Sequence, residues 1–189
     1  AERVLRAKER WIHPAEPESA GRAEDFAAAA RMAREAVTAV RGKACRASEK
    51  TFFCGCADYR MTQASNADPE AKAFPEYMGA RFGAKFAVCS KDPDEKEIAE
   101  LVKCADGAEN IIFSSCNAHL FRGQLALAAV LAEKGVPMTV AALRNPYDLP
   151  LMPENAALLA AFDYSRDSLA ALADVFSGGD CCGVMPAAL

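Results

Sequence analysis

From Thr51 onward, the sequence alternates short apolar runs with longer amphipathic stretches. This alternation is typical of βα units, in which each strand of a mostly parallel sheet is followed by a helix that covers it. Five apolar runs have the length of strands: residues 51–56, 85–89, 110–114, 138–143 and 158–162. The sequence therefore predicts an α/β three-layer sandwich, in which helices flank a mostly parallel sheet of five or six strands.

Helix signals occur at the ends of several amphipathic stretches. Asp92, Pro93 and Glu95 predict a helix with Asp92 as N-cap, Pro93 at the first helical position and an acid in the first turn. Ser165 is a favoured N-cap residue and predicts the start of the last helix. These helices would supply the outer layers of the sandwich.

The N-terminal part of the chain has a different pattern. Residues 2–11 predict a short charged helix, and residues 12–21 contain two prolines and a glycine, which predict a linker. The next segment predicts one further helix, because its apolar residues recur at steps of three and four: Phe26, Ala30, Ala33, Val37 and Val40. We therefore expect residues 1–21 to be the end of a preceding domain and an interdomain linker, and residues 22–189 to form one α/β domain of a longer protein.

The composition limits the class of protein. The 189 residues are 52% hydrophobic and 25% charged, which is the balance of a soluble globular domain. A formal net charge of −4 argues against nucleic acid or a membrane surface as the partner. No apolar run reaches the roughly 20 residues that a membrane-spanning helix needs.

The chain has eight cysteines, and several of them lie in apolar runs of strand length, as Cys54, Cys56 and Cys89 do. This placement predicts reduced, buried thiols and favours a reducing compartment such as the cytoplasm, or an anaerobic source. The pairs Cys54/Cys56 and Cys181/Cys182 lack the two intervening residues of zinc and thioredoxin motifs, so we expect no metal.

The loop after the third predicted strand contains Asn117 and His119. Ligands of open α/β sheets bind at the carboxyl ends of the strands, so both side chains are candidates for contact with a ligand or a neighbouring domain. The alternative is structural, because Ser114, Ser115 and Asn117 also suit the N-cap of the next helix. We favour a cap or a domain contact over ligand binding.

The loop after the fourth predicted strand holds Arg144, Asn145, Tyr147 and Asp148 together with two prolines. The prolines stiffen the loop, and a rigid polar loop suits recognition. The alternative is a turn in which Asp148 binds backbone amides and Tyr147 covers the edge of the core. The sequence supports these two interpretations equally.

Several stretches occur in the order found in a known family. They are residues 2–9, 33–40, 117–119 with Gln124 and Leu125, 143–149 and 168–189. Together they resemble the C-terminal part of glycoside hydrolase family 3, in its β-N-acetylhexosaminidase-like branch. The stretch LRNPYDL at 143–149 is the most specific match, whereas residues 58–84 match no part of the family pattern and Val184 replaces the usual lysine of the final segment.

The resemblance implies a retaining glycosidase whose catalytic Asp lies in a TIM barrel that precedes this domain. The barrel's motifs are absent from this sequence, so we assign no catalytic residue and expect an accessory domain that is inactive alone, without cofactor or metal. It would pack on the barrel, help to shape the cleft for the carbohydrate, and is a candidate for a homodimer contact. The candidate residues for the cleft or the domain interface are Asn117, His119, Arg144, Asn145, Tyr147 and Asp148.

Two other functions remain open at this point. A flavodoxin-like or nucleotide-binding module would use the crevice above the sheet, although the glycine-rich segment 178–183 follows a helix and does not join a strand to a helix. A metal or redox protein would use the cysteines. Asp58 and Asp68, after the first predicted strand, are the other acids of interest.

Overall fold

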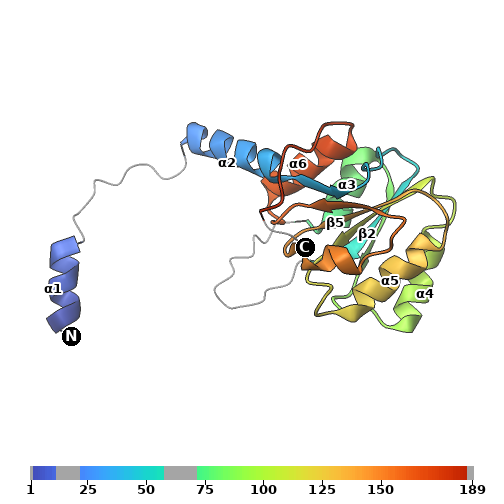
Figure 1. Cartoon of the computed structure of the whole chain (residues 1–189), viewed down its shortest axis with the longest axis horizontal. Coiled ribbons are helices and arrows are strands. Elements are labelled where there is room, and N and C mark those ends of the chain that lie inside the picture. Colours follow the sequence, from blue (N-terminus) through green and yellow to red (C-terminus); the bar gives the residue numbers. More distant parts are fainter. Residues whose placement is uncertain (1, 12–21, 58–71, 187–189) are drawn as a thin grey trace.

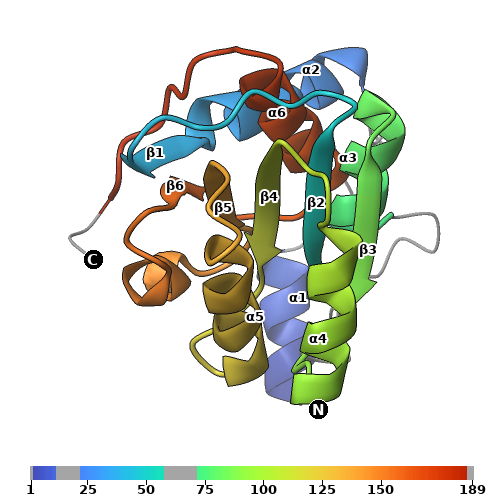
Figure 2. The ribbon, with the colours of Figure 1, turned by 90° about the vertical axis from the view of Figure 1, so that its right-hand side faces the viewer.

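A computed structural model describes residues 2–11, 22–57 and 72–186 of the chain. Figure 1 shows the whole chain, and the described residues contain a six-stranded sheet of order β1-β6-β5-β4-β2-β3 (Figure 2). Strand β1 is antiparallel to β6, and the other neighbours are parallel. The strands are β1 Thr38–Arg41, β2 Thr51–Cys56, β3 Lys85–Cys89, β4 Asn110–Ser115, β5 Met138–Ala142 and β6 Ala157–Ala160.

Helices cover both faces of the sheet, as Figure 2 shows. One face packs against α4 and α5, and the other packs against α3 and α6, with α2 lying along α6. The helices are α1 Glu2–Trp11, α2 Ala23–Ala36, α3 Phe74–Phe82, α4 Glu95–Cys104, α5 Arg122–Ala132, the 3-10 helix η1 Pro146–Leu151 and α6 Arg166–Phe176. The expected three-layer α/β sandwich is confirmed.

The central strands are apolar on both faces, because helices cover both faces of a parallel sheet. In β2, Phe52 faces the α4/α5 layer and Phe53 faces the α3/α6 layer, and both are buried. Phe53 pairs in register with Ile112 of β4. The five runs that the sequence predicts as strands correspond to β2 to β6, with ends that differ by at most two residues.

The sixth strand, β1, lies where we expected the end of a helix, so the prediction of one helix through Val37 and Val40 is wrong. Helix α2 ends at Ala36, and Val37 has an extended backbone with φ −62° and ψ 118°. From Thr38 the chain pairs with β6. The five apolar residues at steps of three and four fit a helix, but the β-branched residues at 37, 38 and 40 also fit a strand. Pairing with β6 selects the strand.

The start of α4 also differs from the prediction. Asp94, rather than Asp92, is the N-cap, and its carboxylate accepts a hydrogen bond from the backbone N–H of Glu97 at 2.8 Å. Asp92 instead accepts from the backbone N–H of Gly123 at 2.7 Å. The loop after β3 is thereby fastened to the start of α5. The predicted cap at Ser165 is confirmed, since its side chain accepts from the N–H of Ser168.

The strand order places a reversal of direction between β2 and β4. The connection through α3 leads from β2 outward to β3, whereas α5 leads from β4 outward to β5 on the other side. Loops diverge at such a point and leave room at the carboxyl edge of the sheet, where doubly wound proteins bind their ligands. The loops that follow β4 and β5 are therefore the first place to look for a site.

None of the described helices is both long and apolar enough to cross a membrane. The predicted linker at 12–21 and the two acids Asp58 and Asp68 lie outside the described residues. The glycine-rich segment after α6 packs against the start of the edge strand β1, where the N–H of Gly183 donates to the carbonyl of Val37 at 2.9 Å. A Cβ atom on Gly183 would lie 2.2 Å from Oγ1 of Thr38, so this glycine serves close packing.

Substitution of Gly55 should reveal how tightly β2 and β4 pack. A Cβ atom at this position would lie 1.9 Å from Oγ of Ser114, so we expect Gly55→Ala to lower the free energy of unfolding by about 3 kcal/mol. Ser114→Gly removes that oxygen, and Gly55→Ala should cost less in its presence. Urea denaturation of the four proteins measures this coupling. Equal losses in both backgrounds would contradict the packing argument.

Candidate functional site

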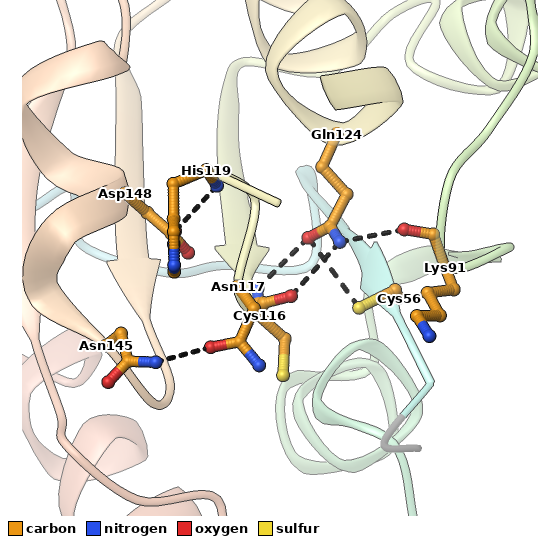
Figure 3. A network of polar contacts seen from close by, with 8 residues as sticks. All are labelled: Cys56, Lys91, Cys116, Asn117, His119, Gln124, Asn145 and Asp148. Atoms are coloured by element: carbon orange, nitrogen blue, oxygen red, sulfur yellow. Dashed lines mark hydrogen bonds and ion pairs between the residues drawn. The ribbon is translucent and has the colours of Figure 1, made fainter. Parts of the chain in front are cut away.

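The loops after β4 and β5 meet at the carboxyl edge of the sheet, and Figure 3 shows the polar contacts between them. Five of the six residues predicted from the sequence lie together there. We call them the carboxyl-edge cluster: Asn117, His119, Asn145, Tyr147 and Asp148. Residues about 30 positions apart are thus brought into contact by two parallel strands that end side by side.

Asp148 is the centre of this cluster. Its side chain is 1% exposed, and its Oδ1 atom receives two hydrogen bonds from His119: one from the backbone N–H at 3.0 Å and one from ring atom Nδ1 at 2.7 Å. The other carboxylate oxygen, Oδ2, is buried and has no hydrogen-bond partner. A buried carboxylate is costly unless it is well paired, so the His119 contacts are what make this placement tolerable.

A second contact joins the same two loops through amide side chains. Nδ2 of Asn145 donates to Oδ1 of Asn117 at 2.6 Å. Asn117 is 2% exposed and has a φ of 56°, in the left-handed region that few residues other than glycine adopt. Its carbonyl accepts from the N–H groups of Leu120 and Phe121, which forms the turn into α5. The expected helix cap is wrong here, since the N-cap of α5 is Phe121 and has no side-chain hydrogen bond.

Tyr147 and Arg144 have different neighbours. Tyr147 is 65% exposed, so it does not cover the core, and its ring lies edge-to-face with His119 at 6.3 Å between centroids. The guanidinium of Arg144 lies over the ring of Tyr164, 5.5 Å from its centroid. Its buried Nη1 has no hydrogen-bond partner. Arg144 is thus the one predicted residue that the structure places outside the carboxyl-edge cluster.

Sequence reasoning assigned no structural role to Gln124, which lies at the reversal point beside the cluster. Its side chain is fully buried and accepts from the backbone N–H of Cys116 at 3.0 Å. Its Nε2 atom donates to the carbonyls of Lys91 and Cys116 at 2.8 and 3.2 Å, and its Oε1 atom also accepts from Sγ of Cys56 at 3.7 Å. Gln124 therefore links the ends of three strands. A polar residue on the apolar face of α5 was the available signal.

The cysteines in the strands are buried, as expected from the sequence. Cys54, Cys56, Cys89 and Cys116 lie in the α4/α5 side of the core, and the described part of the chain contains no group of three or more ligands able to hold a metal. A hydrogen bond with Cys54, together with burial, raises the pKa of the Cys89 thiol. Cys89 therefore stays protonated and a poor nucleophile at neutral pH.

The carboxyl-edge cluster has the parts for binding and for moving a proton. The imidazole of His119 is a donor or acceptor whose orientation Asp148 fixes, and 25% of its side chain is exposed. Tyr147 adds an exposed aromatic face, and Asn145 adds an amide. Among the described residues, the hydrogen-bond partner of the His119 ring is Asp148, so the arrangement presents an oriented imidazole to a ligand or a neighbouring domain.

The fold and this edge define a doubly wound α/β domain with polar loops at the carboxyl ends of β4 and β5. No family model matches the chain, and no curated protein matches it. Solved structures do. The chain is similar to a family 3 glycoside hydrolase, a β-N-acetylglucosaminidase from Paenibacillus sp. str. FPU-7, with a TM-score of 0.79 and 21% identity over 98% of this chain and 38% of that protein.

Two further matches have the same character. A β-glucosidase from Listeria innocua, solved with isofagomine, has a TM-score of 0.70 and 12% identity over 93% of this chain and 30% of its own. A fungal multi-domain family 3 β-N-acetylglucosaminidase has a TM-score of 0.65 and 16% identity over 94% of this chain and 21% of its own. The expected likeness to family 3 is confirmed at the level of the fold, and the chain spans well under half of each relative.

Asn117 offers a test of the strained turn beside the cluster. Asn117→Ala should lower the free energy of unfolding by about 2 kcal/mol, because alanine is unfavourable at this φ and cannot bond Asn145. Asn117→Gly loses the same hydrogen bond but relieves the backbone, so we expect a loss nearer 1 kcal/mol. Thermal and urea unfolding of both variants decide this, and an alanine variant as stable as the glycine variant would refute the strain.

Thiol labelling tests the burial of the cysteines. In the folded protein, Cys104 and Cys182 are exposed and should react rapidly with a chromogenic disulfide reagent, whereas Cys54, Cys56, Cys89 and Cys116 should react only after denaturation. The partly exposed Cys45 and Cys181 should react at an intermediate rate, since burial also raises the pKa of the Cys181 thiol. Reaction of any of the four buried thiols in the native state, or slow reaction of Cys104 and Cys182, would contradict this burial pattern.

Proposed function

We propose that this chain is an accessory α/β domain of a family 3 glycoside hydrolase, of the β-N-acetylglucosaminidase or β-glucosidase type. In this proposal, residues 22–189 form the domain, and residues 1–21 are the end of a catalytic TIM barrel and the connection to it. The domain packs on that barrel and forms one wall of the sugar cleft. It performs no hydrolysis by itself and is also a candidate for a dimer contact.

The observation that carries this proposal is the extent of the structural match. Almost the whole chain, 98%, superposes on part of a single glycosidase, while 62% of that enzyme has no counterpart here, as the 38% coverage implies. A domain that resembles one portion of a larger enzyme is expected to act with the remainder. The ordered motifs that end in LRNPYDL at 143–149 support the same assignment from the sequence.

The carboxyl-edge cluster supports a role beside the cleft. Tyr147 and Leu120 are 65% and 57% exposed, and Leu151 is 54% exposed, so the loops that carry His119 and Asn145 and the adjoining 3-10 helix also present apolar side chains to solvent. Exposed apolar side chains beside a few convergent polar groups are typical of surfaces that bind a partner or a ligand. A surface that meets both a barrel and a sugar would have this mixture.

The inactivity of the isolated chain is the first test. The purified chain, incubated with a chromogenic N-acetylglucosaminide and with a chromogenic glucoside, should give no turnover above the buffer blank. Sequencing the reading frame upstream of Ala1 should reveal a barrel with an Asp nucleophile. Turnover by the chain alone, or an upstream sequence without a barrel, would overturn the proposal.

The role in the cleft is tested in the full-length enzyme that the upstream sequence would define. Tyr147→Ala should raise KM with little change in kcat, because it removes binding surface and leaves the reacting groups in place. Glu133→Ala, at the end of α5 away from the carboxyl edge, is the matched control and should leave both constants unchanged. Equal effects of the two substitutions would argue against a wall formed by this loop.

A further inference from the structure

We propose that His119 binds a hydroxyl group of a neutral sugar through ring atom Nε2, and that Asp148 is the positioning residue that keeps this nitrogen facing the ligand. The inference rests on the proposed function and deepens it, because it names the group that touches the sugar and the chemical state of that group.

The contacts with Asp148 determine which nitrogen of the His119 imidazole carries the proton. Oδ1 of Asp148 receives the backbone N–H of His119 and also lies 2.7 Å from Nδ1. A carboxylate oxygen only accepts hydrogen bonds, so Nδ1 must carry the proton. In the neutral ring, Nε2 is then an acceptor with a free lone pair.

The burial of Asp148 determines the direction in which Nε2 of His119 faces. The carboxylate of Asp148 is 1% exposed, whereas the side chain of His119 is 25% exposed, so the pair has a buried side and an open side. The described residues offer Nε2 no hydrogen-bond partner. Because Nδ1 faces the buried carboxylate, Nε2 lies on the opposite side of the ring, where a ligand hydroxyl can reach it.

The aromatic neighbour of His119 indicates the kind of ligand. The ring of Tyr147 is exposed and stands edge-to-face with His119, so an aromatic ring is available to a ligand beside the imidazole. Sugars present hydroxyl groups along their edges and apolar C–H groups on their faces, which matches an acceptor nitrogen beside an aromatic ring.

The charge of the His119–Asp148 pair limits the ligand further. The His119–Asp148 pair is negative when the imidazole is neutral, and Oδ2 of Asp148 has no donor to offset its charge. Arg144, the cation of the same loop, lies over Tyr164. A phosphate or carboxylate on Nε2 would face this uncompensated negative charge at short range, so the surface selects a neutral ligand.

The test is nitrogen NMR of the purified chain with 15N-labelled histidine. The sequence has two histidines, His13 and His119, and His13→Gln assigns the signals. We expect Nδ1 of His119 to be protonated and Nε2 to have the shift of a lone-pair nitrogen. Titration with N-acetylglucosamine into the millimolar range should move Nε2, whereas inorganic phosphate at equal concentration and ionic strength should not.

Variants separate binding from folding. Asp148→Asn removes the charge that fixes the proton, so the tautomer bias should decrease and sugar affinity should fall about tenfold, the loss expected when a charge-assisted hydrogen bond becomes a neutral one. His119→Phe keeps an aromatic ring and should abolish the response, which is then followed through the ring signals of Tyr147. His13→Gln should bind like the wild-type chain. Circular dichroism identifies any variant that has lost its fold, and His119→Gln replaces such a variant.

Three outcomes overturn the inference: an Nε2 signal that sugar does not move, an Nε2 that carries the proton in the free chain, or a response to phosphate in place of sugar. None of them touches the proposed function, which depends on the inactivity of the chain and on the upstream barrel. Conversely, a chain that hydrolyses the chromogenic substrate would end the proposed function even if His119 bound the sugar as described.

Discussion

Parallel pairing among β2, β4 and β5 is the constraint on which the rest of this structure depends. Parallel strands must be joined by crossovers, and these crossovers supply the helices that bury both faces of the sheet. The same pairing brings the carboxyl ends of β4 and β5 together, because Ser115 pairs with Ala142 at their last residues. The loops that follow β4 and β5, which carry the polar residues, therefore begin side by side at the carboxyl edge of the sheet.

At that edge, local strain and charge burial are stabilised by contacts between the two loops. Asp148 is buried with one of its oxygens unsatisfied, and Asn117 has a left-handed backbone. Each feature costs free energy, and each is held by a hydrogen bond to the neighbouring loop, from His119 in one case and Asn145 in the other. Such costs are concentrated at functional edges, and the Gln124 contacts beside them provide a rigid support.

The sequence was sufficient for the layers and for the position of the candidate loops, and the reason is local. Runs such as 51–56 are apolar on both faces over the length of a strand, a signal that needs no knowledge of the partner strands. Strand β1 escaped prediction because its four residues become a strand only beside β6, which lies more than 110 residues away. The contact between His119 and Asp148 was not predicted either, because it joins two separate loops and each loop alone is compatible with a cap or a turn.

The antiparallel edge formed by β1 and β6 has a mechanical consequence. Val37, at the entrance to the sheet, accepts a hydrogen bond from Gly183, close to the end of the described chain. The segment after α6 is therefore fastened to the edge strand at the point where α2 ends and β1 begins. A pull on the segment after α6 would load this contact and the short β1–β6 ladder first, whereas a pull from the N-terminal side would first load the packing of α2 on α6. In both cases the strands β4 and β5, whose loops carry the carboxyl-edge cluster, lie further inside the sheet and would be loaded later.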